Sequence, residues 1–124
     1  MLAVFFLITD HPPARAAEFP FGMEMTLDAR PQPGTKRIPV IEIDDKGAAK
    51  LDLWCKSGRG QFSIANDTVI FIAGEINDSA CTSASAQADD ALLRALGDAA
   101  TWSRQGNAIL FNGPTTVRFR LNTN

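Results

Sequence analysis

Two cysteines, Cys55 and Cys81, constrain most strongly what this chain can fold into. They bracket a stretch patterned as a β-hairpin, and the one convincing helical pattern follows the second cysteine. The two thiols lie about 26 residues apart, so a disulfide would stabilise the fold by roughly 3 kcal/mol through chain entropy. Two free buried thiols are the alternative. We favour the disulfide because the cysteine count is even and the N-terminus is patterned for export.

The first 17 residues have the pattern of a secretory signal peptide. An apolar run at residues 2–8 is followed by a small-x-small pattern at residues 14–17, which suits cleavage after Ala16 or Ala17. A buried first strand is the alternative, because seven apolar residues could also pack in a core, and the basic residues that usually precede the apolar run of a signal peptide are absent. The run is shorter than the ~20 residues that span a bilayer, and no cysteine stands at the cleavage point to carry a lipid. We therefore expect a periplasmic or secreted protein with residues 1–17 removed.

Composition argues against several classes of function. The chain has 124 residues, a hydrophobic fraction of 45% and a net charge of -2, which fits one small domain and gives no electrostatic reason to expect nucleic acid or an anionic membrane as partner. Its single histidine, His11, lies in the predicted leader. Nucleophilic triads and most zinc sites need histidine, and the cysteines lack the Cys-x-x-Cys spacing of a redox dithiol. We expect a monomer with no catalytic, cofactor or metal site.

Alternating apolar and polar residues predict antiparallel strands in the N-terminal part of the chain, residues 18–50. These patterns cover residues 21–27 and 38–43, with a proline-rich loop between them. Residues 44–47 (Asp-Asp-Lys-Gly) have the composition of a solvated turn, which fits them better than an acid pair or a metal site. A third strand is expected at residues 49–53.

Residues 62–72 predict a β-hairpin. Asn66 and Asp67 stand where a two-residue turn would lie, and both residue types tolerate positive φ. Gly58 and Gly60 precede the hairpin. Glycines at this spacing are a weak phosphate-loop signal, and no helix follows to direct its amides at a phosphate, so a tight turn or β-bulge is the better interpretation.

A short amphipathic helix is expected after the second cysteine. Ser83 and Ser85 are candidate N-caps. Asp89 and Asp90 fall in early turns, where the helix dipole favours anions. Gly97 suits the left-handed residue that follows a helix. The apolar stripe, which we expect to pack on a sheet, comprises Ala88, Leu92, Ala95 and Leu96, with Leu93 beside it.

The C-terminal part predicts more strands around Trp102, at residues 109–111 and at 117–121. Arg118 and Arg120 would lie on the outer face of the last strand. Anion binding is one interpretation, and a charged sheet edge that discourages aggregation is the more economical one. The predicted fold class is α+β: a single small domain, mainly an antiparallel curved β-sheet, with one short amphipathic helix.

These residues together resemble the META domain, or HslJ-like heat-shock protein, family over residues 51–121. Trp54-Cys55-Lys56 stands where the family usually has Gly-Cys-Asn, and of a Thr-x-Met-Ala pattern only Ala80 is kept. The resemblance implies a small α+β unit of bacterial envelope proteins linked to stress, motility or secretion, without established catalytic residues. The matching positions are Cys55, Gly60, the 62–72 hairpin, Ala80-Cys81, Leu92, Leu93, Leu96, 107–111 and 117–119.

Three functions follow from these observations. The first is a non-enzymatic exported META-type domain that acts in envelope stress or binds an unknown envelope protein. The second is a secreted, disulfide-stapled inhibitor of a hydrolase, with loops at residues 56–60 and 82–85 beside the bridge. The third is a carboxylate-dependent enzyme, which requires a pocket where two acidic residues converge. The candidates are Asp44, Asp52, Asp67, Glu75 and Asp78.

Overall fold

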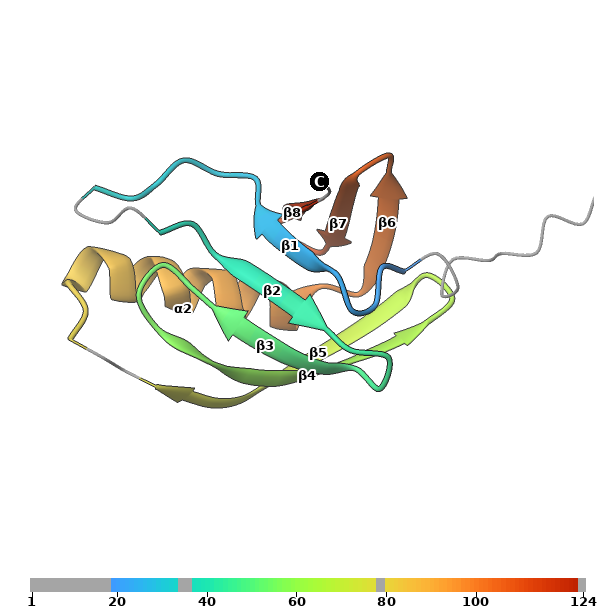
Figure 1. Ribbon diagram of the computed structural model, residues 1–124, viewed down its shortest axis with the longest axis horizontal. Helices are drawn as coiled ribbons and strands as arrows, with labels where there is room; N and C mark the ends of the chain where they lie inside the picture. The colour runs from blue at the N-terminus through green and yellow to red at the C-terminus, as the bar shows by residue number, and fades with distance from the viewer. Residues whose placement is uncertain (1–18, 34–36, 78–79, 123–124) are drawn as a thin grey trace, which may run out of the picture.

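A computed structural model describes residues 19–33, 37–77 and 80–122, so the predicted leader and Asp78 lie outside the described residues. Within them, antiparallel strands form one closed barrel in the order β1 to β8, and helix α2 lies against it (Figure 1). The predicted α+β fold, mainly antiparallel with one helix, is confirmed. The strands are β1 (Glu24–Leu27), β2 (Val40–Ile43), β3 (Ala48–Asp52), β4 (Ser57–Ala65), β5 (Thr68–Asn77), β6 (Thr101–Gln105), β7 (Ala108–Asn112) and β8 (Val117–Leu121), and the helix is α2 (Ser83–Asp98).

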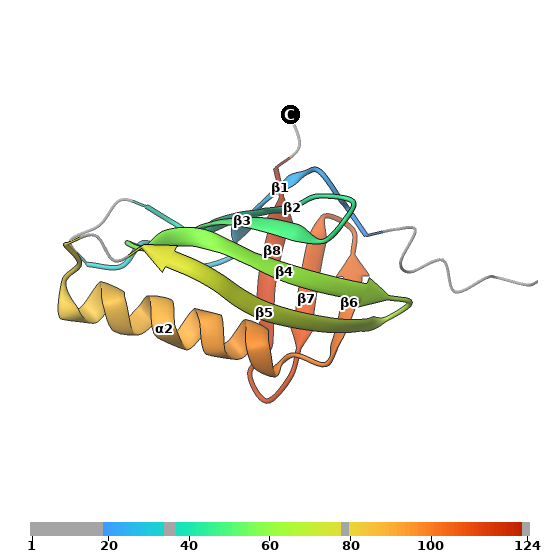
Figure 2. The same ribbon diagram turned by 90° about the horizontal axis from the view of Figure 1, so that it is seen from below.

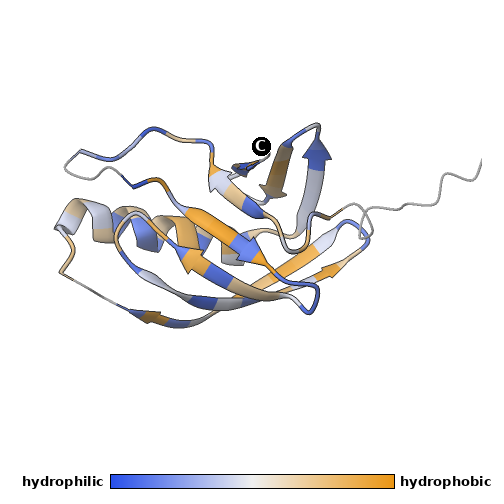
Figure 3. Ribbon diagram, viewed as in Figure 1, coloured by the Kyte–Doolittle hydropathy of each residue, from blue (hydrophilic) through white to orange (hydrophobic). Residues whose placement is uncertain are grey.

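The core lies inside the barrel because strand residues alternate between its two faces. In β8, for example, Val117, Phe119 and Leu121 are buried while the two arginines between them are exposed. The alternation is visible as changing colours along the strands in Figure 3. The ring of Phe111 lies 5.5 Å from Phe62 and 5.9 Å from Phe119, centroid to centroid, so aromatic contacts link β4, β7 and β8 across the interior.

The predicted hairpin is present as β4 and β5, and it is longer than the sequence pattern indicated. Asn66 and Asp67 form the two-residue turn, and Asn66 has a φ of 55°. The register shifts between Gly58 and Gly60, which confirms the predicted bulge. A Cβ on Gly58 would lie 2.1 Å from the carbonyl oxygen of Glu75. Glycine therefore allows the two backbones to approach each other here.

The barrel closes between β5 and β6 through one residue pair, Thr68 with Thr101. Beyond that pair β5 diverges from β6, and α2 lies alongside β5 on the side away from β4 (Figure 2). The helix therefore covers the strand edge that would otherwise expose unpaired amides. The first and last strands of the barrel are paired along their length. β1 pairs with both β2 and β8, and the N–H of Asn122 donates to the carbonyl of Glu24 at 3.0 Å.

The ends of the helix differ from the predicted ones. The N-cap is Thr82, whose side chain accepts from the N–H of Ser85, so Ser83 and Ser85 lie inside the helix. Gly97 is also helical and is not the left-handed residue after it. The C-cap is Ala99, in extended conformation with its N–H bonded to the carbonyl of Leu96. Ala99 is buried, and the chain enters β6 directly without needing a left-handed turn.

The N-terminal strands are shorter than the sequence pattern indicated. β1 begins at Glu24 because a turn precedes it, in which the N–H of Met23 donates to the carbonyl of Pro20 at 3.3 Å and Gly22 has a φ of 80°. β2 begins after Pro39, which has no N–H to donate but accepts a hydrogen bond from Leu27 through its carbonyl at 2.8 Å. No helix in the described part of the chain is long and apolar enough to cross a membrane.

Candidate functional site

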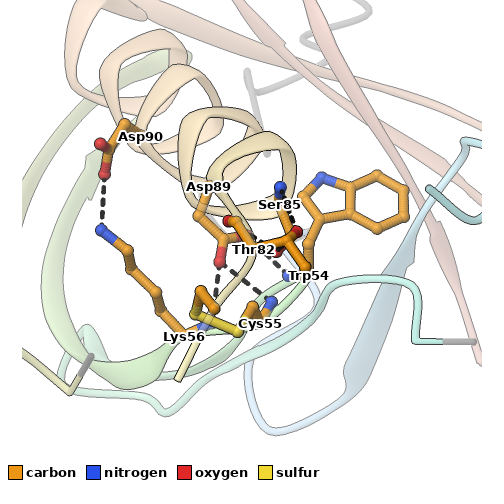
Figure 4. Close-up of polar contacts among 8 residues, drawn as sticks. Trp54, Cys55, Lys56, Thr82, Ser85, Asp89 and Asp90 are labelled. Carbon is orange, nitrogen blue, oxygen red and sulfur yellow. Dashed lines mark hydrogen bonds and ion pairs between the residues drawn. A yellow bond between two sulfur atoms is a disulfide. The ribbon is translucent and has the colours of Figure 1, made fainter. Parts of the chain in front are cut away.

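One buried carboxylate organises the region around the disulfide. Asp89 projects from α2 towards the turn that joins β3 to β4, and it is completely buried. One carboxylate oxygen accepts the N–H of Trp54 at 2.7 Å, and the other accepts those of Cys55 at 3.0 Å and Lys56 at 2.8 Å (Figure 4). Three consecutive amides therefore converge on one side chain, which satisfies both the carboxylate and the turn.

The disulfide joins the same turn to the start of the same helix. Cys55 and Cys81 are bonded, with their Cα atoms 5.8 Å apart, as the sequence predicts. Cys81 immediately precedes the N-cap Thr82. We call the disulfide and Asp89, with the amides of residues 54–56, the clasp: one covalent and one polar link between the β3–β4 turn and α2.

Polar contacts extend the clasp on both sides. The hydroxyls of Thr82 and Ser85 lie 2.8 Å apart, and Ser85 is buried on the helix face that also carries Asp89. On the outer side the ammonium group of Lys56 pairs with the exposed carboxylate of Asp90 at 2.9 Å. Leu53 donates its N–H to the carbonyl of Lys56 at 2.8 Å, which closes the turn.

The polar groups and sulfur atoms of the clasp are used in bonds within the protein. The oxygens of Asp89 are directed at backbone amides and enclosed by protein, so no substrate atom has access to them. Within the described residues, no group of three or more His, Cys, Asp and Glu side chains is placed to hold a metal ion. The sulfur atoms are used in the disulfide.

The acidic residues proposed for a carboxylate enzyme are mostly dispersed. Asp52 and Glu75 line the same open depression of about 190 Å³ on the outer surface, together with Lys50 and Arg59. Asp44 instead accepts the N–H groups of residues 46 and 48 in the predicted turn. Asp67 lies in the hairpin turn at the opposite end of β5 from Glu75. Two of the five candidates thus share a surface, and Asp78 lies outside the described residues.

Two other predicted surfaces are corrected by the structure. Arg118 and Arg120 do not mark a sheet edge, because β8 pairs with β1 on one side and β7 on the other. Both arginines instead pair with Asp28, at 3.1 and 3.8 Å. The expected inhibitor loops are regular structure: residues 57–60 belong to β4, and residues 82–85 are the cap and first turn of α2.

The sequence pattern did not reveal the role of Asp89. It was expected to be stabilised by the helix dipole, whereas it lies beyond the first turn, which holds no acidic residue. The spacing of Asp89 indicates that it is buried. It lies three residues before Leu92 and seven before Leu96, and so on the same buried face of the helix. A carboxylate on an apolar stripe needs donors, and the amides of a nearby turn supply them.

The fold and the clasp define a class: a small antiparallel barrel with one helix beside β5 and a disulfide between that helix and the β3–β4 turn. The META domain family model matches residues 23–123, so the chain belongs to the META domain family and the resemblance is confirmed. The match includes β1 and β2 as well as residues 51–121. A solved structure described as "NMR structure of the protein" is similar in fold, with a TM-score of 0.60 and 17% identity over 81% of this chain and 89% of that chain. No curated protein matches the sequence.

Proposed function

We propose that this META domain is exported and acts, as a monomer without catalytic activity, as a binding module for a protein of the bacterial envelope, in a stress-related role. Export is supported by the leader pattern of residues 1–17 and by the disulfide, which persists in oxidising compartments. The family to which the chain belongs supports the envelope setting.

The observation that carries a binding role is a pair of exposed isoleucines. Ile70 and Ile72 point outward from β5 with 60% and 65% of their surface exposed, and among the described residues Met23 is the only other large hydrophobic residue that is exposed. Gln61 and Ser63 lie opposite them on β4. Exposed apolar side chains on neighbouring positions of one strand face gain free energy when a partner protein covers them, which supports a protein-binding face here.

Site-specific photocrosslinking in cells tests this proposal. A photoreactive residue at position 63, beside Ile70, should give a crosslinked envelope protein, and the Ile70→Thr/Ile72→Thr variant should lose it. The same probe at Thr116, an exposed residue between β7 and β8, serves as control. Equal products at both positions, or no dependence on the isoleucines, would contradict the proposed surface.

Export has its own test. The intact mass of protein from the periplasm should correspond to loss of the first 16 or 17 residues and to two hydrogens fewer than the reduced chain. A mature species that keeps Met1, or that alkylates at both cysteines without reductant, would overturn the proposed compartment.

A further inference from the structure

We propose that Asp89 is a positioning residue for the disulfide. By holding the backbone of Cys55 against α2, it brings the two thiols together before they are oxidised. It thereby determines how readily the bridge forms and how strongly it resists reduction.

The position of Cys55 is determined by Asp89. The carboxylate accepts the N–H of Cys55 itself and those of both its neighbours, at 2.7 to 3.0 Å. Three hydrogen bonds from consecutive residues to one side chain restrict the path of that backbone relative to the helix, and charge-assisted bonds of this kind are stronger than neutral ones. Cys55 therefore has a defined place beside α2 without any contribution from the sulfur–sulfur bond.

Cys81 is positioned by the same helix. It precedes the N-cap Thr82, whose side-chain oxygen accepts the N–H of Ser85 at 3.2 Å. Ser85 and Asp89 lie one turn apart on the buried face of α2. Both cysteines are thus placed by one rigid element. Asp89 binds the Cys55 backbone directly, whereas the Lys56–Asp90 ion pair reaches α2 only through the flexible side chain of the next residue.

Holding the two cysteines close together favours the intramolecular step of disulfide formation. In exchange with a small disulfide such as oxidised glutathione, one protein thiolate attacks a glutathione sulfur, forms a mixed disulfide and releases one glutathione thiol. The second protein thiolate then displaces the second glutathione, and the two protein thiol protons end on the two glutathione thiols. The equilibrium of the intramolecular step depends on the effective concentration of one thiol at the other. Asp89 raises that concentration.

The test compares Asp89→Asn with Asp90→Asn in the full mature protein. The second variant makes the same chemical change one residue away, at an exposed carboxylate that pairs with Lys56. Each protein is equilibrated with reduced and oxidised glutathione, and the oxidised fraction is measured by alkylation and mass. We expect Asp89→Asn to lower the equilibrium constant about tenfold or more, equivalent to a potential ~30 mV less reducing. Asp90→Asn should stay within about twofold of the parent, because the carboxylate of Asp90 is solvent-exposed and touches no backbone amide of residues 54–56.

This readout distinguishes positioning from general stabilisation. A residue that stabilised the reduced and oxidised forms equally would leave the glutathione equilibrium unchanged when replaced. An unchanged constant for Asp89→Asn, or an equal fall for Asp90→Asn, would overturn the proposal.

A second measurement decides the matter if Asp89→Asn fails to fold when reduced. In a Cys55→Ser/Cys81→Ser variant, which has no bridge, the amides of residues 55 and 56 should exchange with solvent at least ~100-fold more slowly than in an unfolded chain, because their bonds to Asp89 remain. Exchange of these amides at the unfolded rate in a variant that is otherwise folded would show that Asp89 does not position Cys55 without the disulfide.

Discussion

The indole N–H of Trp102 donates a 2.7 Å hydrogen bond to the carbonyl of Asn66. This bond crosses from β6 to the turn between β4 and β5, beside the single residue pair that closes the barrel there. The backbone N–H of Trp102 also donates to the carbonyl of Asp67 at 2.9 Å, and that of Val69 donates to Ala100 at 3.0 Å. The tip of the longest hairpin is thus fastened to β6 by a few bonds around one tryptophan.

Trp102→Phe should loosen this closure while keeping the aromatic packing. The ring of Trp102 is buried and meets Phe19 edge-on at 4.9 Å. Loss of the indole hydrogen bond should lower the free energy of unfolding by about 1–2 kcal/mol. Hydrogen exchange should accelerate at Val69, beside the closure, more than at Phe119 in the core. Equal acceleration at both amides would indicate a general loss of stability instead.

Asp89→Ala should be strongly destabilising even in the oxidised protein. The substitution leaves three amides in a part-buried turn without acceptors, and we expect a loss of about 3 kcal/mol or more in urea unfolding. Asp90→Ala removes only an exposed partner of Lys56 and should change stability by less than ~1 kcal/mol. Similar values for the two variants would mean that the amides find other partners.

Two glycine-to-alanine substitutions should have opposite effects on stability. At Gly58 the added Cβ would lie 2.1 Å from a backbone oxygen of β5, whereas at Gly97 nothing lies within 4 Å. Gly58→Ala should therefore destabilise the protein by about 2 kcal/mol or more through overpacking. Gly97→Ala, inside α2, should stabilise it by roughly 0.5–1 kcal/mol. Thermal unfolding of both variants tests the bulge and the position of the helix end together.

Substitutions at two adjacent residues of β5, Phe71 and Ile72, should have very different effects on stability. Phe71 faces the core and packs on Phe62 at 4.6 Å between centroids, while Ile72 is 65% exposed. Phe71→Ala should cost about 3–5 kcal/mol, whereas Ile72→Ala should change stability by less than ~1 kcal/mol. A large loss at Ile72 in the monomer would show that its surface is covered, which would also remove the basis for the proposed binding face.

Local signals in the sequence predicted the local structure well. The Asn66-Asp67 turn, the bulge near Gly58 and the alternation in β8 each depend on a few adjacent residues, and all three are present. The disulfide followed from cysteine number and the inferred compartment. The helix was predicted from its apolar stripe, but its ends were not, because several residues near each end had suitable capping chemistry.

Features that depend on distant residues were not predicted. Closure of the sheet brings together Thr26 and Asn122, which are 96 positions apart, and no local pattern encodes that pairing. The pairing also explains why the charged face of β8 is not an edge. The role of Asp89 also depends on distant residues, because its three hydrogen-bond donors lie more than 30 positions earlier in the chain. Only the three-dimensional structure places that turn beside the helix.

The pairing of β1 with β8 has a consequence for how this domain can be combined with others. The backbone of Glu24, in the first strand, is hydrogen-bonded to that of Asn122, just after the last strand, so the first and last strands of the barrel are neighbours. A unit of this kind, taken with Phe19 so that its ring stays packed on Trp102, can be placed in a surface loop of a host protein, and its own ends can be joined by a linker and reopened elsewhere. The META barrel is therefore a suitable cassette for domain insertion and circular permutation.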